Sequence, residues 1–444
     1  MRGTRGARIL AMTMVVLTAT TFAEVARAGH NQAMAAPGSS VSHGDTITAS
    51  PPTWGYFKPG FSYPTFAPDG TLYITDCLNA RIYEVTSEGP RGHVTVFAGA
   101  GPGGLTQWSR LKAMTGTSSP VVKQYGWATV AAMGGDGQHP TDAYFKCAAD
   151  MVFDPAGDMY VSDHLNSRIR EITADGFVDT AGGVGPGFKY WGPWTPGVGS
   201  EAGDGGPATH GIFDAPTGMA MDPDGNLFIA DRDHDAIREI DSHGTLTTVA
   251  GTGSRGFDGD HQPAAEAMLA RPLAVAFDAA GNLYISDENN HRIRKVDTHG
   301  VITTFAGTGA YGCGGDGGPA VDASLRNPND IVIAPDGSML ISDSECHNVR
   351  RIAPDGTIST FAGGLHATSC RGRFGQPVRR MPVLGEVYFA YGPDGDLYFT
   401  PCGSEYLVRV DRMGITHLFA RAPNLSGDLK RPSIDELRSS RAER

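Results

Sequence analysis

The chain has 444 residues, of which 40% are hydrophobic and 19% are charged, and its formal net charge is −12. This acidic balance argues against nucleic acid or an anionic membrane surface as a partner. Beyond the N-terminal segment, no stretch is long and apolar enough to predict a membrane span. A glycine-rich run at 307–315 resembles a phosphate-binding loop only superficially, because no long helix follows it, so we expect no nucleotide cofactor.

The first 28 residues have the pattern of a secretory signal peptide. Three arginines among the first eight residues precede an apolar run at 9–22, and Ala-Arg-Ala at 26–28 offers a cleavage site. We therefore expect a secreted, extracellular protein from which residues 1–28 are removed. Residues 29–59 are predicted to be a flexible leader, 60–420 the folded domain and 421–444 a charged C-terminal tail.

One short segment recurs along the folded domain, with MDPDGNLFIAD at 221–231 as a clear copy. Its copies end, in chain order, at Asp76, Asp163, Asp231, Asp287, Asp343 and, in a blurred last copy, Pro401. Three of these aspartates follow one another at intervals of 56 residues. A period of this length is typical of repeat architectures.

Each unit predicts four short strands. Examples of the first, second, third and fourth strand are 216–222, 226–230, 168–172 (from an earlier unit) and 245–253. Apolar and polar residues alternate in these runs, and Gly, Pro, Asp and Asn separate them. A four-stranded sheet of this size cannot bury both faces alone, whereas six sheets arranged around an axis can. We therefore predict an all-β fold, a six-bladed β-propeller of four-stranded antiparallel blades, and a monomer.

Six cysteines suit an oxidising compartment. Their places in the repeat lie in the loops between second and third strands and between blades, which open onto one face that we call the cysteine-bearing face. The sequence spacing favours the pairs Cys77–Cys147, Cys313–Cys346 and Cys370–Cys402. A free or metal-binding pair stays an alternative, although no Cys-x-x-Cys spacing is present.

A glycine-rich linker precedes several blades and is clearest in GDGGPA at 315–320. Its aspartate suits calcium, because carboxylates in flexible loops bind hard cations. Recurrence in four blades favours a structural role instead, with glycines in tight turns and Pro319 opening a short helix through Leu325. The four linker aspartates are Asp136, Asp204, Asp260 and Asp316.

Together these motifs resemble the NHL-repeat family. The likeness is carried by GNLYISD at 281–287, NHRIRKVD at 290–297, FAGTG at 305–309 and GDGGPA at 315–320, and it weakens in blades 1 and 6. The linker variant is similar to that of teneurins and of many exported bacterial proteins. The resemblance implies a six-bladed propeller but no single activity, because relatives include binding scaffolds, an amidating lyase and antibiotic-degrading lyases.

One column of the repeat, near the start of the innermost strand, breaks the pattern. Its six occupants are Tyr63, Asp150, Gly218, Ala274, Asp330 and Tyr388. Innermost strands line the axis, so two carboxylates would converge at its mouth and repel each other unless a cation neutralises them. A solvated polar channel mouth is the alternative.

This column is similar to the axial site of gluconolactonase/regucalcin-type propellers. Asn329-Asp330 resembles their Asn-Asp motif and Gly385-Glu386 resembles their Gly-Glu motif, whereas Gly218 and Ala274 depart from the pattern. The resemblance implies one divalent cation, with calcium as the first choice, held by Glu386, Asp330, Asn329 and Asp150.

Two Gly/Pro-rich inserts, at 101–134 and 185–199, carry aromatic residues that suit sugar rings, aromatic ligands or protein partners. Local packing against blade edges is the alternative. Together with residues of the channel mouth, the predicted ligand-binding set is Tyr63, Tyr388, Trp127, Tyr190, Trp191, Trp194 and Arg232.

Two functions follow from these observations. In the first, an exported recognition module binds a small molecule, a carbohydrate or an extracellular protein through its disulfide-braced, aromatic-rich face. In the second, a metal-dependent hydrolase or lyase of lactonase or esterase type uses the axial cation to polarise a carbonyl or activate water. Asp150 or His164 would then serve as the catalytic base. The sequence leaves open whether the protein is an enzyme.

Overall fold

The computed structural model describes residues 62–86, 94–100, 136–185, 203–364, 374–401 and 406–421. The predicted signal peptide and leader, the C-terminal tail beyond Arg421 and the aromatic residues of both inserts lie outside this set. Within the described residues, no helix is long and apolar enough to cross a membrane.

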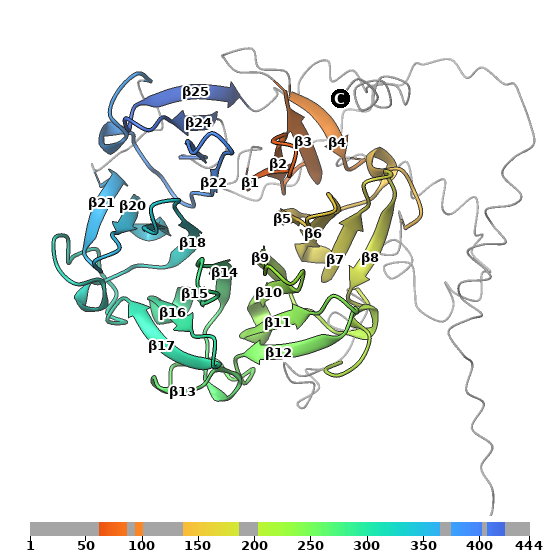
Figure 1. Cartoon of the computed structure of the whole chain (residues 1–444), viewed down its shortest axis with the longest axis horizontal. Coiled ribbons are helices and arrows are strands. Elements are labelled where there is room, and N and C mark those ends of the chain that lie inside the picture. Colours follow the sequence, from red (N-terminus) through yellow and green to blue (C-terminus); the bar gives the residue numbers. More distant parts are fainter. Residues whose placement is uncertain are drawn as a thin grey trace, which may run out of the picture. The chain divides into compact units, whose positions relative to one another are not determined.

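Six antiparallel sheets stand around a common axis, which confirms the six-bladed β-propeller (Figure 1). Every blade is built from strands that are consecutive in sequence, and the first strand of each blade lies nearest the axis. Blade 1 contains β1 (Pro64–Phe66), β2 (Leu72–Asp76), β3 (Arg81–Val85) and β4 (Val94–Ala98). Blade 2 contains β5 (Ala148–Phe153), β6 (Met159–Asp163), β7 (Arg168–Ile172) and β8 (Val178–Gly182).

The remaining blades repeat this order. Blade 3 contains β9 (Pro216–Met221), β10 (Leu227–Asp231), β11 (Ala236–Ile240) and β12 (Leu246–Ala250). Blade 4 contains β14 (Pro272–Phe277), β15 (Leu283–Asp287), β16 (Arg292–Val296) and β17 (Val301–Ala306), with the two-residue β13 (Gln262–Pro263) at its outer edge. Blade 5 contains β18 (Pro328–Ile333), β19 (Met339–Asp343), β20 (Asn348–Ile352) and β21 (Ile358–Gly363). Blade 6 contains β22 (Phe389–Tyr391), β23 (Leu397–Phe399), β24 (Tyr406–Val410) and β25 (Thr416–Arg421).

The alternation in the sequence places the strands within two or three residues. The run at 168–172 is β7 itself, and β9 and β10 begin or end one residue from the predicted bounds. All five residues of β10 are buried, as they are in β2, β15 and β19, because each face of a second strand packs against a neighbouring blade. The hydrophobic core is therefore divided into clusters between adjacent blades rather than gathered at one centre.

The glycine-rich linkers hold neighbouring blades together at their outer edges. Between blades 2 and 3, the N–H groups of Gly183 and Val184 donate to the linker carbonyls of Ala208 and Gly211. The predicted helix from Pro319 to Leu325 is wrong in length. It is a single 3₁₀ turn, Ala320–Asp322, because Ala323 returns to an extended conformation (φ −75°, ψ 156°) that carries the chain into the core.

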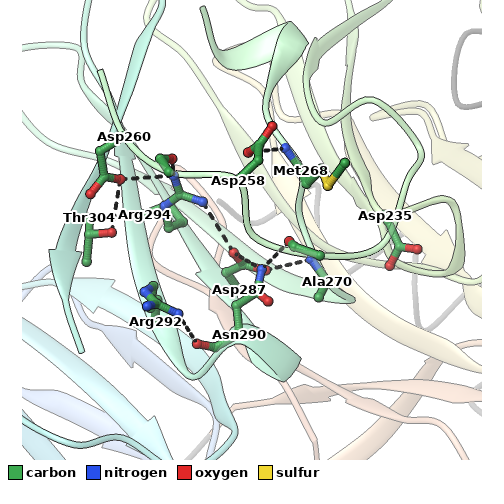
Figure 2. Close-up of polar contacts among 12 residues, drawn as sticks. Asp235, Asp258, Asp260, Met268, Ala270, Asp287, Asn290, Arg292, Arg294 and Thr304 are labelled. Carbon is green, nitrogen blue, oxygen red and sulfur yellow. Dashed lines mark hydrogen bonds and ion pairs between the residues drawn. The ribbon is translucent and has the colours of Figure 1, made fainter. Parts of the chain in front are cut away.

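A buried arginine on the third strand joins each linker aspartate to the second-strand aspartate of the same blade (Figure 2). In blade 4, Arg294 is fully buried and lies 3.1 Å from Asp260 and 3.6 Å from Asp287. Asp287 also accepts from the backbone N–H of Ala270 and from the amide of Asn290. We call this arrangement the arginine pillar; the pillars of the other three blades are centred on Arg170, Arg238 and Arg350. The linker aspartates are engaged here, which supports their structural role.

Candidate functional site

Two of the three predicted disulfides are present on the cysteine-bearing face. Cys77 bonds to Cys147 and joins blades 1 and 2, and Cys313 bonds to Cys346 within blade 5. Cys346 closes the short 3₁₀ turn after β19, while Cys313 lies in the linker before β18. The predicted partners Cys370 and Cys402 lie outside the described residues. The described bonds tie inter-blade loops to the loops after second strands, so they brace this face.

The two axial aspartates lie at bulges of their innermost strands, where the ladder register shifts and backbone N–H groups lose their strand partners. The N–H of Met151 donates to Oδ1 of Asp150 (2.7 Å), and the N–H of Met219 in blade 3 donates to Oδ2 (2.7 Å). Each oxygen of this carboxyl therefore accepts a backbone hydrogen bond, one from its own blade and one from the next.

Asp330 repeats this pattern on the opposite side of the ring. Its Oδ1 accepts from the N–H of Ile331 and its Oδ2 from the N–H of Phe389 in blade 6, both at 2.9 Å. The aspartates of blades 2 and 5 thus accept a backbone N–H from blades 3 and 6, respectively. In blades 3 and 6 the same column holds Gly218 and Tyr388. A Cβ at Gly218 would lie 2.6 Å from the carbonyl oxygen of Leu273, so any side chain there would clash with blade 4.

Burial is the largest influence on the pKa of both aspartates. It raises the pKa of Asp150 to about 7, since desolvation of the charged form outweighs the two backbone donors that favour it. Burial also raises the pKa of Asp330 well above its usual value, and the charge of Asp150 raises it further. The charge of Asp150 thus acts on Asp330, so the two carboxyls lie in the same axial region.

The two tyrosines of the column close the ring between blades 6 and 1. The rings of Tyr63 and Tyr388 lie with centroids 3.9 Å apart, and the hydroxyl of Tyr388 donates to Oε2 of Glu386 (2.5 Å). Burial raises the pKa of both phenols. Both hydroxyls therefore stay protonated at neutral pH. The hydroxyl proton of Tyr388 is already used in the hydrogen bond to Glu386.

The donors predicted to hold a cation do not form a compact set. Asp150 and Asp330 use their oxygens on backbone N–H groups, and Glu386 is exposed and bound to Tyr388. In the part of the chain that the structure describes, no group of three or more His, Cys, Asp or Glu side chains is placed to hold a metal ion. Asn329 is buried, and its backbone carbonyl accepts from Ser286. The calcium ion stays a prediction.

A second irregular column lies on the same face, directly after the second-strand aspartates. In blades 2–5 it holds His164, Arg232, Glu288 and Ser344, four residues of different chemistry. Sequence reasoning singled out the first two and missed Glu288, although the same blade-by-blade comparison, moved to this column, would have found it. We call these four residues the rim column.

Charged groups of the rim column shift one another's pKa values: the charge of Arg232 acts on both His164 and Glu288. Nδ1 of His164 lies 3.1 Å from the carbonyl oxygen of Pro216, and burial lowers the pKa of this imidazole. Burial raises the pKa of Glu288 to about 7; the charge of Arg232 opposes this rise, and that of Glu386 adds to it. Within the described residues, Nε of Arg232 and Oε2 of Glu288 are buried without a hydrogen-bond partner. Such atoms are costly to bury unless something else pairs with them.

Large apolar side chains are also exposed on loops of this face. Tyr311 is 55% exposed beside the Cys313–Cys346 disulfide, with its ring under the guanidinium of Arg326 (4.2 Å), and Leu165 next to His164 is 48% exposed. The predicted aromatic ligand-binding residues Trp127, Tyr190, Trp191 and Trp194 lie outside the described residues.

The NHL repeat model matches residues 269–296, which span β14 to β16. Teneurin-4 of Homo sapiens is 30% identical over 185 residues, which are 37% of this chain and only 6% of that protein's length. Among solved structures, a streptogramin B lyase is similar over 84% of this chain and 86% of its own (13% identity, TM-score 0.43). A putative gluconolactonase is similar over 82% and 91%, respectively (12% identity, TM-score 0.44). The structure is thus a six-bladed β-propeller that contains an NHL repeat at 269–296 and is similar to teneurins over about a third of its length.

Proposed function

We propose that this protein is an exported recognition module that binds a small molecule, a carbohydrate or an extracellular protein on its cysteine-bearing face. The observation that carries the proposal is the rim column. Structural positions of the repeat, such as the pillars, keep one residue type through blades 2–5, whereas the rim column holds His164, Arg232, Glu288 and Ser344. A position that varies while its scaffold stays constant supports recognition rather than folding.

The surroundings of the rim column support the same function. The Cys313–Cys346 disulfide holds the turn that carries Ser344, and the N–H of His164 donates to the carbonyl of Cys147, which is bonded to Cys77. Restraint of these two turns lowers the entropy lost when a ligand binds. Nε of Arg232 and Oε2 of Glu288 have no hydrogen-bond partner among the described residues, and Oε2 lies 3.9 Å from Nε of Arg271 in an ion pair. Both side chains are partly exposed, so a polar ligand would supply the missing hydrogen bonds. Disulfides are consistent with an extracellular location, and the signal peptide remains a prediction.

The test is a thermal-shift screen of the purified protein against free sugars, oligosaccharides and small zwitterions. Any compound that raises the melting temperature is then tested on Arg232→Met and Glu288→Gln. Asp355→Asn is the matched control, because Asp355 lies in the exposed turn between β20 and β21, at the other end of the blade. We expect both rim variants to lose the shift and the control to keep it; a shift retained in both rim variants would place binding elsewhere.

A divalent-metal-dependent hydrolase or lyase is the second candidate. The observation in its favour is the pKa of Asp150, about 7, which suits a general acid or base near neutral pH. Asp150, Asp330, Asn329 and Glu386 would supply the oxygen donors, and the cation would polarise a carbonyl or activate water. This candidate requires that EDTA remove a stoichiometric cation and lower the melting temperature of the wild type but not that of Asp330→Asn. An equal melting temperature with and without EDTA rejects it.

A further inference from the structure

Three arginines of the cysteine-bearing face are paired with carboxylates of the turns that follow the second strands. The described pairs are Arg255–Asp235, Arg271–Asp233, Arg271–Glu288 and Arg326–Glu345. Arg232 differs from these three. Its Nε is buried without a hydrogen-bond partner, and no carboxylate of the described residues forms an ion pair with its guanidinium. A partly buried guanidinium without a counter-charge can bind an anion through two parallel N–H groups.

Glu386 in blade 6 is a negative charge without a cationic partner. It lies two residues before the axial column. The other described blades have an alanine or a proline there: Ala148, Pro216, Pro272 and Pro328. The carboxylate of Glu386 is exposed and accepts from the neutral hydroxyl of Tyr388, but it forms no ion pair with any residue that the structure describes. Since four blades fold with a small apolar residue at this position, the fold does not require a carboxylate there.

The position of Glu386 and the rim column belong to the same opening. In blade 3, Pro216 pairs across the ladder with Asp231, the residue directly before Arg232. The same pairing recurs in blades 2, 4 and 5. His164 extends toward this position in the next blade, because its Nδ1 lies 3.1 Å from the carbonyl oxygen of Pro216. Rim-column residues and the position of Glu386 are therefore neighbours around one opening, which we call the axial mouth.

Arg232 and Glu386 lie on opposite sides of the axial mouth. Two blades separate blade 3 from blade 6 in either direction around the axis (Figure 1). Glu288 in blade 4 is influenced by both residues, since the charge of Arg232 lowers its pKa and the charge of Glu386 raises it. The axial mouth thus presents an unpaired cation on one side and an unpaired anion on the other, with Glu288 within electrostatic range of both.

Acceptors flank the cation of Arg232. A carbonyl oxygen can only accept, so the contact with Pro216 assigns the proton of His164 to Nδ1 and leaves Nε2 as an acceptor. Oε2 of Glu288 lies 3.9 Å from Nε of Arg271, beyond hydrogen-bond distance, and has no hydrogen-bond partner among the described residues. A ligand that binds Arg232 through an anionic group therefore gains if it also carries N–H donors.

We propose that the axial mouth binds a small zwitterion, whose carboxylate contacts Arg232 and whose ammonium group contacts Glu386 and Glu288. This inference rests on the proposed recognition function and adds the class of ligand. A neutral sugar would leave both charges without a counter-charge, and a simple anion would neutralise Arg232 alone. Both ends of a zwitterion must reach their partners at once, so the affinity should depend on the length of the ligand.

Isothermal titration calorimetry of the full chain with linear ω-amino acids, from glycine to aminooctanoate, tests the inference. Acetate and propylamine carry one charge each and serve as the matched halves. We expect one length to bind most tightly, at least ~10-fold better than either half, because each charged end adds its own charge-assisted hydrogen bonds.

Variants separate the two ends of the ligand. Arg232→Met and Glu386→Gln should each weaken the best zwitterion at least ~10-fold, whereas Asp355→Asn should not. Arg232→Glu should lose the zwitterion and bind the linear diamine of the same length, a switch that a structural role of Arg232 would not produce. Unchanged affinity in both single variants would overturn the inference. If sugars bind through Arg232 and Glu288 while no zwitterion binds, the inference fails and the recognition function stands; if no compound of any class binds, both fail.

Discussion

Replacing Asp150 by alanine tests whether the axial carboxyls serve the fold. Asp150→Ala removes the acceptor of two buried N–H groups, those of Met151 and Met219, each bonded at 2.7 Å. An unsatisfied buried donor costs about 1–3 kcal/mol, so the loss of unfolding free energy should be about 2–6 kcal/mol. Asp355→Ala is the matched control, because its carboxylate also accepts a backbone N–H (2.9 Å) but in an exposed turn, and it should cost less than about 1 kcal/mol.

Urea denaturation followed by circular dichroism measures both variants, and its pH dependence sharpens the result. The pKa of Asp150 is raised in the folded state to about 7, above its unfolded value of 3.8. The stability that protonation contributes is therefore fully present below pH 3.8 and is lost as the pH rises through about 7. The wild type should gain stability relative to the non-titrating Asp150→Asn as the pH falls from 8 to 4. A cost for Asp150→Ala no larger than that of Asp355→Ala would refute this reasoning.

Three further measurements test other parts of the structure. Asp287→Ala leaves Arg294 with Asp260 as its remaining carboxylate and removes the acceptor of two donors, the N–H of Ala270 and the amide of Asn290, so it should cost about 2–6 kcal/mol. Arg351→Ala breaks an exposed pair and should cost under about 1 kcal/mol; equal costs in urea denaturation would contradict the pillar. Reducing the disulfides should lower the unfolding free energy by about 2–4 kcal/mol per bond, and Cys313→Ser with Cys346→Ser should reproduce one such loss. Burial lowers the pKa of His164, so its imidazole should titrate below 6.5 in an NMR experiment; a midpoint above 6.5 would show that the ring is not buried as described.

The strands were predictable because alternation and turn residues are local signals. The same repeat also located Asp150 and Asp330 near the axis, and it paired Cys77 with Cys147 through the loops that share a face. Their surroundings could not be predicted, because a bulge shows only in the pairing of two strands. Knowing that Asp150 faces the axis does not reveal that a backbone N–H of the next blade needs its oxygen.

The pillars were missed for a different reason. The aspartate of the GDGGPA linker and the arginine of the third strand were both visible, and their separation of 34 residues is constant in blades 2–5. Each motif also suits a role of its own, a tight turn or a third strand, so nothing in either one alone indicates that Asp260 pairs with Arg294. Glu288 stands out only when the column after the second-strand aspartates is compared between blades, because a lone glutamate in a loop carries no signal of its own. Comparison of every column finds both from sequence alone.

The order of the strands bears on how such a ring can change over generations. Among the described strands, none is supplied to a blade by a distant part of the chain, and blades 6 and 1 meet through contacts such as Tyr63 against Tyr388 and the hydroxyl of Thr400, which donates to the carbonyl of Ser62. A gene duplication of one whole unit therefore adds a complete blade without disturbing strand pairing in the others. The ends of the chain can likewise be moved to another junction by circular permutation. Because each blade is a separate unit of sequence, the loops of the cysteine-bearing face can diverge one blade at a time.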